Sequence, residues 1–384
     1  METRKLYYED CHLVEFTATV VACTETPKGY RVILDATAFY PEGGGQACDL
    51  GTLGDARVLD VREQDGQVVH LCNKPLAVGE TVEGRIDYER RFDLMQQHTG
   101  EHILSGLIHA TFGYHNVGFH MGKQAMEVDF DGPIPMDAIA QLEAKANAAV
   151  WQNLPLRCWY PSLEELPHVT YRTKRELPWP VRIVQVPGFD SCACCGVHVA
   201  RTGEVGIIKI LSAVKFHQGV RLEMLCGRRA YEYLCRVYDE NRLVSQTFSA
   251  KVLQTGDAAQ RMNEQLNQEK FRSAMLEKRV FAGIASGYAG SGNVVHFEND
   301  LSSSAVRELA DAIAEGCGGI AAVFSGSDDA GYSFCLIGKN LDVKPLGTAL
   351  TKTLSGRGGG KPGSFQGSVK AAKTQIEAFF QQSK

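Results

Sequence analysis

The spacing of hydrophobic residues divides the chain into a β-rich beginning and more helical stretches behind it. Residues 1–90 contain alternating or β-branched runs such as HLVEFTATVVAC, RVILDATAFY and ARVLDVREQ, separated by turn-like sequences such as ETPKG and EQDG. This pattern is typical of short antiparallel strands. It predicts a β-barrel-like subdomain. In the next stretch, ERRFDLMQQHTGEHILSGLIHATFG, apolar residues recur at helical intervals, which predicts a long helix.

Three further segments follow this β-rich beginning. Residues 91–228 combine helical patterns with strand-like runs such as PVRIVQVPG and VRLEMLCG, which predicts an α/β domain with helices on a sheet. Residues 229–285 are polar and largely helical, and Glu269 and Ser273 interrupt their apolar seam, so we expect a connector rather than a long coiled coil. Residues 290–384 alternate strands and helices as a small C-terminal α/β domain. The predicted fold class is therefore α+β.

Composition and charge narrow the classes of protein. Among 384 residues, 44% are hydrophobic and 22% charged, which is typical of a soluble globular protein. No apolar run is long enough for a membrane span, and the charged N-terminus does not read as a signal peptide. We therefore expect a cytoplasmic protein whose twelve cysteines are thiols or metal ligands.

The net charge of −5 argues against nonspecific wrapping of nucleic acid. A specific nucleic-acid partner needs only a local basic patch. The candidate patches are Arg172, Lys174, Arg175 and Arg182, and the adjacent Arg228 and Arg229.

Two short motifs predict a metal site. In HTGEH, His98 and His102 stand four residues apart on the predicted helix, so they share a face with Cβ atoms roughly 5–6 Å apart. In SCACCGVHV, Cys194 and His198 have the same separation in a turn-prone segment. Three imidazoles and a thiolate are a common ligand set for zinc. Cys192 and Cys195 compete for the sulfur position, and spacing does not choose among the three cysteines.

The role of such a metal stays open at this point. Four protein ligands are typical of a structural zinc site, whereas a catalytic site keeps one position for water. HTGEH also matches the HxxEH signature of inverted zinc proteases, in which Glu101 would activate water and a downstream carboxylate would be the third ligand. That alternative leaves the CCGVH segment and the glycine loop described next unexplained.

Two glycine-rich segments are candidates for ligand contacts. FYPEGGGQACDLG either brings backbone N–H groups close to a ligand or forms a simple hairpin turn, and Thr37 just upstream could place a hydroxyl in a pocket. SGRGGGKPGSFQGS fails the P-loop pattern at Ser355 and Pro362, and Lys361 breaks the dinucleotide pattern GxGxxG. It predicts a flexible loop with Arg357 and Lys361 at its tips, suited to an RNA backbone.

These motifs, in this order, resemble one family over nearly the whole chain. QQHTGEHILSGL and SCACCGVHVARTGEVGIIKI look like the HxxxH and CxxxH motifs of alanyl-tRNA synthetase editing domains and their freestanding AlaX relatives. FYPEGGGQACDLG resembles the glycine motif of the preceding subdomain, and GRGGGKPGSFQGS is similar to the DHH-associated domain that ends alanyl-tRNA synthetases. Nothing resembles the aminoacylation core, so the resemblance is to the long form of the freestanding editing proteins.

The resemblance implies roles for individual residues. The implied metal ligands are His98, His102, Cys194 and His198, so it selects Cys194 among the cysteines. The implied catalytic residues are His98, His102 and Thr37, with Thr37 recognising a serine hydroxyl. The implied tRNA contacts are Gly43, Gly44, Gly45, Gln46, Arg357 and Lys361. Cys195 and Val197 depart from the family's CGGTH, and a related threonyl-tRNA synthetase domain works without an obligatory metal, which keeps the role of zinc open.

The implied function is trans-editing by hydrolysis of mischarged tRNA(Ala). Seryl-tRNA is the first candidate substrate and glycyl-tRNA the second, with one Zn²⁺ per chain. The alternatives are a non-catalytic tRNA-binding module with structural zinc and the HxxEH protease. A DHH phosphoesterase is disfavoured because the chain has no DHH sequence. The C-terminal domain is a candidate for contact with the tRNA elbow and for homodimer formation.

Overall fold

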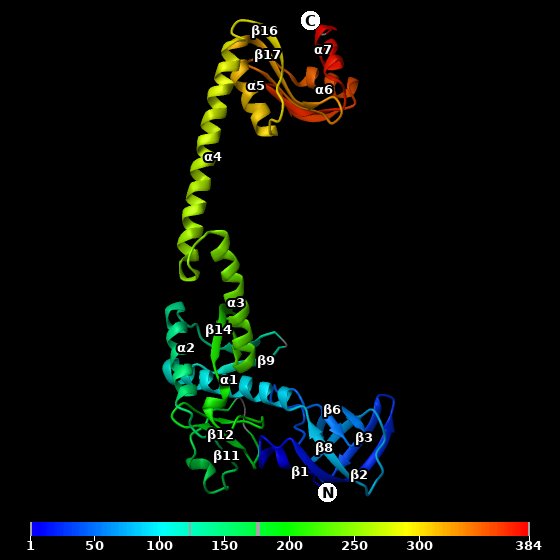
Figure 1. Cartoon of the computed structure of the whole chain (residues 1–384), viewed down its shortest axis with the longest axis vertical. Helices are drawn as coiled ribbons and strands as arrows, with labels where there is room; N and C mark the ends of the chain where they lie inside the picture. Colours follow the sequence, from blue (N-terminus) through cyan, green and yellow to red (C-terminus); the bar gives the residue numbers. More distant parts are fainter. Residues whose placement is uncertain (1, 123, 174–176, 383–384) are drawn as a thin grey trace. The chain divides into compact units, whose positions relative to one another are not determined.

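The computed structural model describes residues 2–122, 124–173 and 177–382, and it has the mixed α+β content expected from the sequence. The chain splits into two compact units, Met1–Leu243 and Val244–Lys384 (Figure 1). The division falls within helix α3 (Gly227–Thr247). The four-segment division stays a prediction. Within the described residues, no helix is both long and apolar enough to cross a bilayer.

The first unit begins with strands that close into a barrel, drawn in blue in Figure 1. In β8, Val82, Gly84 and Ile86 are buried and the residues between them are exposed, which is the period of two of a strand with one covered face. Gly29 begins β3 with φ of 133°, and a Cβ there would lie 2.4 Å from the carbonyl oxygen of Cys72, so this turn requires glycine. In order of pairing the strands are β2 (Glu15–Thr26), β3 (Gly29–Leu34), β7 (Gln67–Cys72), β6 (Ala56–Gln64), β5 (Gly51–Leu53) and β8 (Thr81–Ile86), and a parallel pair lies outside them, β1 (Arg4–Lys5) and β4 (Ala36–Thr37).

Helix α1 (Tyr88–Phe112) carries the HTGEH motif through the middle of the first unit. Asp87 caps it by accepting a hydrogen bond from the Arg90 N–H, and Gly113 ends it at φ of 75°. The helix is buried without interruption over residues 94–106, polar residues included. This burial follows from its contacts with α2 on one side and with strands of two different sheets.

Those two sheets are small, and their strand pairs are antiparallel. They frame the candidate site, because β13 leads directly into the CCGVH segment and β9 follows the turn after α1. The first sheet has the order β14 (Ile208–Phe216), β15 (Gly219–Cys226), β10 (Met126–Phe130), β9 (Asn116–Met121), and the second the order β11 (Arg157–Trp159), β12 (Ile183–Val186), β13 (Asp190–Ala193), with α2 spanning Met136–Trp151.

The second unit contains helix α4 and one five-stranded sheet. The strands β16 and β17 run parallel, and the remaining pairs are antiparallel. Helix α5 buries an apolar stripe that includes Val306, Leu309 and Ile313 against this sheet. The elements are α4 (Thr255–Ser286), β16 (Gly292–Phe297), α5 (Ser303–Cys317), β17 (Gly318–Ser327), β18 (Gly331–Gly338), α6 (Lys344–Thr353), β19 (Arg357–Lys361), β20 (Ser364–Val369) and α7 (Lys373–Gln382), with the sheet order β16-β17-β18-β20-β19.

The predicted flexible loop around RGGGK is wrong. Arg357–Lys361 forms the edge strand β19, which pairs with β20 in a hairpin. Its glycines permit the pairing, because a Cβ at Gly360 would lie 2.1 Å from the Ser364 carbonyl oxygen. All five residues of β19 are nevertheless exposed, so Arg357 and Lys361 stand at the two ends of a solvent-facing strand.

Candidate metal centre

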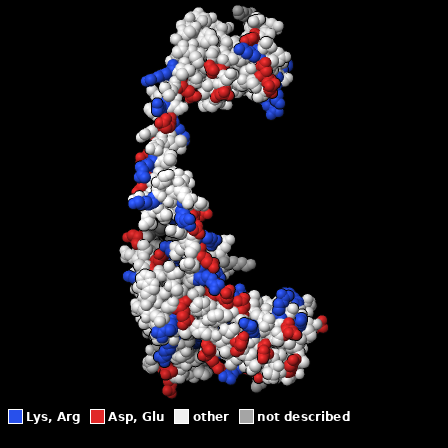
Figure 2. All heavy atoms as spheres, in the orientation of Figure 1, with Lys and Arg blue, Asp and Glu red and all other residues white. Residues whose placement is uncertain are grey.

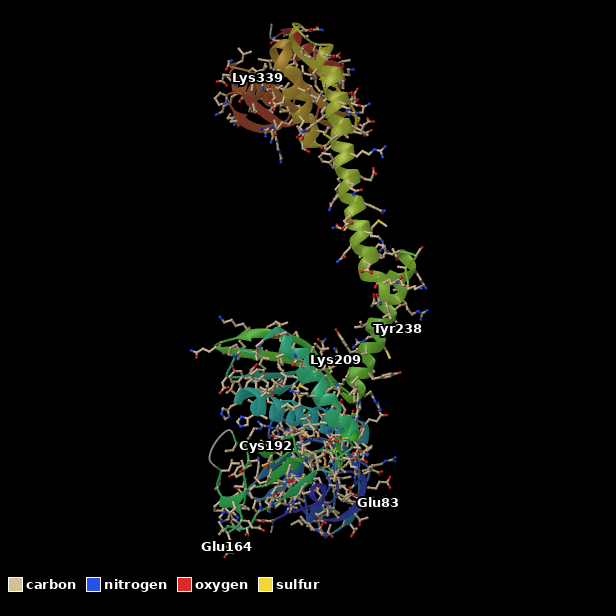
Figure 3. The ribbon with its side chains drawn as sticks, turned by 90° about the vertical axis from the view of Figure 1, so that its left-hand side faces the viewer. Glu83, Glu164, Cys192, Lys209, Tyr238 and Lys339 are labelled. Carbon is tan, nitrogen blue, oxygen red and sulfur yellow. The ribbon has the colours of Figure 1, made fainter. Side chains whose placement is uncertain are left out.

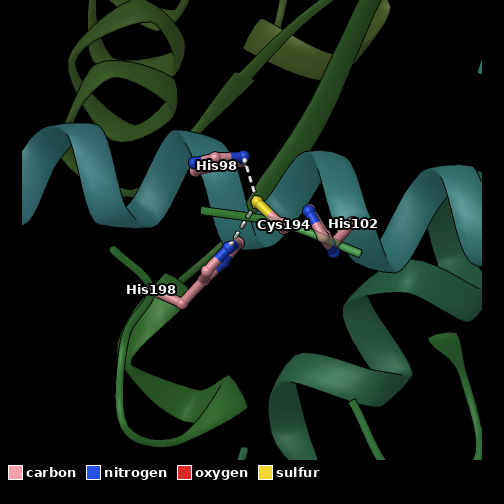
Figure 4. Close-up of side chains that lie close together, drawn as sticks. All are labelled: His98, His102, Cys194 and His198. Atoms are coloured by element: carbon pink, nitrogen blue, oxygen red, sulfur yellow. Dashed lines mark hydrogen bonds between the residues drawn. The ribbon is translucent and has the colours of Figure 1, made fainter. Parts of the chain in front are cut away.

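The structure brings the four predicted ligands together. His98 and His102 project from successive turns of α1, and Cys194 and His198 come from the segment after β13 (Figure 4). The Sγ atom of Cys194 lies 3.4 Å from Nε2 of His98 and 3.5 Å from Nε2 of His198. One ligand atom from each of the four side chains lies within 4.8 Å of all the others, so the cluster could hold a metal ion.

Two of the histidines are held from behind by neutral side chains. Nδ1 of His98 lies 2.8 Å from Oε1 of Gln46, which also accepts the Val197 N–H at 3.2 Å. Because this oxygen is an acceptor, His98 donates from Nδ1 and keeps a lone pair on Nε2. Nδ1 of His198 lies 3.1 Å from the Thr99 hydroxyl. Such contacts fix the tautomer and the ring orientation of a ligating histidine.

The third histidine faces a carboxylate. Nδ1 of His102 lies 3.1 Å from Oδ2 of Asp190, and Arg172 binds both oxygens of Asp190 at 2.7 and 2.9 Å. Burial lowers the pKa of His102, but Asp190 and Cys194 outweigh it and raise the pKa well above its usual value. Burial raises the pKa of Asp190, but His102 and Arg172 outweigh this effect and lower it. Asp190 and Arg172 therefore form an ionic support behind His102.

The thiol of Cys194 is in an environment that favours the thiolate. Burial raises its pKa, but His98, His102 and His198 together lower it well below the usual value. Its segment is fixed by Arg182, whose Nη1 donates to the carbonyl oxygens of Cys194 and Gly196, both at 2.9 Å. A thiolate and three oriented imidazoles fit the ligand preferences of a borderline-soft divalent metal.

A cavity of about 690 Å³ opens beside the cluster. Its wall includes three of the four ligands and the nearly buried Glu101 and Asn116. Cys192, which lies beside α1 in the first unit (Figure 3), also reaches it. The lining residues are Gly44, His98, Glu101, His102, His115, Asn116, Val117, Phe119, Arg172, Thr173, Leu177, Cys192, Ala193, Cys194 and Cys195.

Thr37 is not among the residues that line this cavity, and its role in recognising a serine hydroxyl stays a prediction. Its side chain is fully buried, and its hydroxyl lies 2.9 Å from Nε2 of His70 and accepts the Phe39 N–H at 3.1 Å. Burial lowers the pKa of His70 to about 4, so the ring is neutral near neutral pH. Its Nδ1 donates to the Val32 carbonyl, which leaves Nε2 as the acceptor of the Thr37 hydroxyl. The threonine hydroxyl therefore has its partners inside the protein.

The residues of the GGGQ motif differ in their relation to the cavity. Gly44 lines the cavity, and Gly45 has φ of 83° with room for no side chain, because a Cβ would lie 2.6 Å from the Phe119 ring. Gly43 and Gln46 form an isolated bridge that closes the turn. Gln46 is fully buried behind His98, where its side chain positions this histidine, and its contact with tRNA stays a prediction.

Most of the predicted basic patch is committed to internal partners. Arg172 is paired with Asp190, and Arg182 is buried with its guanidinium 4.3 Å from the Tyr8 ring centre. Arg229 binds the Asp93 carboxylate, and Arg228 lies 3.3 Å from Glu89. Lys174 and Arg175 lie outside the described residues. Arg357 and Lys361, which the sequence predicts as contacts for an RNA backbone, are both exposed.

Sequence reasoning missed the supports of the cluster. Thr99 stands inside HTGEH and Gln46 inside GGGQ, but neither residue type signals a contact with histidine. Asp190 and Arg172 are 18 residues apart and meet through the arrangement of β13, which no local pattern predicts. The HxxEH protease is not favoured, because the ligand group that contains both His98 and His102 is completed by a thiolate and a third imidazole. The Asp190 carboxylate groups with His102 and Cys192 but not with His98.

Comparisons with known proteins agree on one family. Residues 2–90 match the model of class II (A) tRNA synthetases, and residues 181–224 match that of the second additional domain of threonyl- and alanyl-tRNA synthetases. The mouse alanyl-tRNA editing protein Aarsd1 is 29% identical, with 97% of this chain and 96% of that protein aligned. The alanine–tRNA ligase of Thermofilum pendens is 32% identical over 97% of this chain, which spans 43% of the ligase.

A solved structure gives only a weak likeness. The C-Ala domain of Aquifex aeolicus alanyl-tRNA synthetase aligns with 23% of this chain and 87% of its own length at 19% identity and a TM-score of 0.21, which carries no argument about the fold. The mouse and Thermofilum relatives each align with 97% of the chain, and one of the two family models spans Cys194 and His198. Over nearly its full length, the chain is homologous to the alanyl-tRNA editing proteins at about 29% identity.

Proposed function

We propose that this protein is a hydrolase that removes serine from mischarged alanine tRNA by cleaving the aminoacyl ester. The observation that carries the proposal is the cluster of three imidazoles and a thiolate at the wall of a 690 Å³ cavity. A cavity of this size is within the usual range for small-molecule sites and suits an aminoacyl group with its ribose. The names of the relatives supply the class of substrate.

A zinc ion is the metal that this donor set would hold best. His98, His102 and His198 would offer Nε2, because their Nδ1 atoms face Gln46, Asp190 and Thr99. Bound zinc would supply positive charge beside the ester carbonyl oxygen. Gln46, Asp190 and Thr99 behind the imidazoles would orient them toward the ion.

The chemical logic of editing supports serine as the first substrate. A synthetase pocket sized for alanine cannot strongly reject a residue that adds only a hydroxyl, nor glycine, which lacks only a methyl group. A second site that hydrolyses the wrong ester provides the missing discrimination. Glycyl-tRNA is therefore the second candidate substrate.

The four-donor set also favours one alternative. Closed zinc sites with four protein ligands are usually structural, so the protein would then bind tRNA without cleaving its ester. The two functions differ in a single readout, the release of the amino acid.

The proposal is tested with seryl-, glycyl- and alanyl-tRNA of the alanine type. Wild type, His102→Ala and His120→Ala are compared for ester release and zinc content. His120 is exposed on β9 and does not line the cavity, so it is a matched control. We expect rapid loss of serine but not alanine from wild type and His120→Ala, and a loss of at least a hundredfold in His102→Ala. Intact esters with a zinc-loaded wild type would support the tRNA-binding module.

A further inference from the structure

Three polar residues beside the cluster form a hydrogen-bonded group of their own. Glu101 and Ser105 lie one turn apart on α1, and Asn116 begins β9. Their exposed fractions are 5%, 1% and 6%. Oε1 of Glu101 accepts hydrogen bonds from the Ser105 hydroxyl and from Nδ2 of Asn116, both at 2.5 Å. A buried carboxylate is thus held rigidly through one of its two oxygens.

These bonds fix the orientation of the asparagine amide. Because a carboxylate oxygen only accepts, the group of Asn116 that faces Glu101 is the NH₂ group. Oδ1 of Asn116 is therefore turned to another side, and it is buried without a hydrogen-bond partner. A buried acceptor without a donor is costly, and it indicates a place where a ligand donor would be stabilising.

The position of Glu101 relates this cluster to the reacting group. Glu101 and Asn116 line the same cavity as His98, His102 and Cys194. Oε2 of Glu101 lies 4.0 Å from Nε2 of His102, the nitrogen that faces away from Asp190. The cavity's Arg172 binds both oxygens of Asp190. If the carbonyl group of a ligand lies beside His102, a substituent two bonds from its carbonyl carbon would come within reach of Glu101.

An aminoacyl ester carries its α-ammonium group two bonds from the carbonyl carbon. We propose that Glu101 and Asn116 form a subsite for this ammonium group, with Oε2 of Glu101 as the charged acceptor and Oδ1 of Asn116 as the neutral one. An ammonium has three N–H donors, so it can satisfy both acceptors at once. The inference rests on the proposed function and specifies its substrate: an ester with a free amino group, whichever amino acid it carries.

A blocked amine separates this subsite from the rest of the reaction. N-acetylseryl-tRNA keeps the ester, the hydroxyl and the tRNA, but it has no ammonium to pair with the carboxylate. We expect wild type to prefer seryl-tRNA over N-acetylseryl-tRNA in kcat/KM by about ten- to a hundredfold, as for a charge-assisted hydrogen bond. Glu101→Gln keeps a carbonyl oxygen for Ser105 and Asn116, and it should lower this preference to about threefold or less with zinc content unchanged.

Two control variants accompany the test. Glu127→Gln removes a carboxylate from β10 outside the cavity lining, and it should keep the wild-type preference. Thr37→Val should also keep it, since the Thr37 hydroxyl is bonded to His70. A non-hydrolysable analogue, 3′-serylamido-3′-deoxyadenosine, and its N-acetyl form give the same comparison by calorimetric titration.

Each outcome decides one question. Equal rates on the two esters by wild type, or an equal loss on both esters in Glu101→Gln, would overturn the ammonium subsite. Loss of zinc in Glu101→Gln would do the same and make Glu101 a support of the metal. If wild type cleaves neither ester, the proposed function fails, and the two analogues still test the subsite, since equal binding by wild type would overturn it.

Discussion

At the scale of single residues, the site is defined as much by what lies behind the histidines as by the histidines themselves. An amide and a hydroxyl lie within hydrogen-bond distance of the Nδ1 atoms of His98 and His198, and a carboxylate lies 3.1 Å from that of His102, so the opposite nitrogens face the Cys194 sulfur. The spacing of HTGEH and CCGVH predicted which four side chains could meet. It could not predict the supports, because Gln46 lies 52 residues from His98 in the sequence, and Asp190 meets His102 only through the way β13 packs on α1. Spacing also left three cysteines open, and the resemblance selected Cys194.

The support of His98 gives a testable consequence for metal binding. In Gln46→Ala the His98 ring loses the acceptor that fixes its tautomer, so zinc affinity should fall about ten- to a hundredfold. Competition with a chromophoric chelator measures this directly. Gln141→Ala, on the exposed face of α2, is the control and should keep wild-type affinity. Unchanged affinity in Gln46→Ala would mean that the amide is not needed to orient the ligand.

At the scale of elements, sequence patterns predicted α1, α2 and the longer strands, but not the short pieces that complete the site. Strand β13 has four residues and β9 six, and each pairs in a short hairpin with the strand next to it in the chain, β12 and β10, so that packing of the hairpin rather than a long apolar pattern specifies it. The RGGGK segment was predicted to be a loop, because its composition does not indicate a strand. Glycine has low strand propensity by itself, yet here the absence of side chains lets β19 approach β20.

Glycine also sets how closely α1 approaches its neighbours. A Cβ at Gly100 would lie 2.2 Å from Sγ of Cys226 on β15, within the HTGEH motif itself. Gly100→Ala should therefore destabilise the first unit by about 1–2 kcal/mol, because the overlap outweighs the gain in helix propensity. Gly283→Ala on α4, where a Cβ would meet nothing within 4 Å, should instead stabilise by about 0.5–1 kcal/mol. Denaturant unfolding of both variants decides, and a stabilised Gly100→Ala would contradict the close packing.

At the scale of the whole molecule, the distribution of charge does not indicate which surface would bind a nucleic acid. The net charge is −5, and on the face drawn in Figure 2 basic and acidic side chains are interspersed. The predicted patch around Arg172 and Arg182 is occupied by internal partners, because both guanidinium groups stabilise the loop that carries Cys194. The order of motifs along the chain predicted the family, whereas the distribution of charge did not predict where tRNA would bind. The homodimer through the C-terminal domain likewise stays a prediction.

The exposed ends of β19 offer a test of tRNA binding that is separate from the chemistry. If Arg357 and Lys361 contact phosphates, Arg357→Ala with Lys361→Ala should raise KM for seryl-tRNA about tenfold and reduce the salt dependence of binding by about two phosphate contacts. The rate at saturating tRNA should not change, since the metal cluster lies in the other compact unit. Arg307→Ala with Lys344→Ala removes the same charge from helices of the same unit and serves as the control. If KM rises equally in both double variants, the cause is the change in net charge, and the assignment of β19 to the tRNA fails. If KM rises only in the Arg357 and Lys361 variant, the two cations contact the tRNA directly, because both variants lose the same charge.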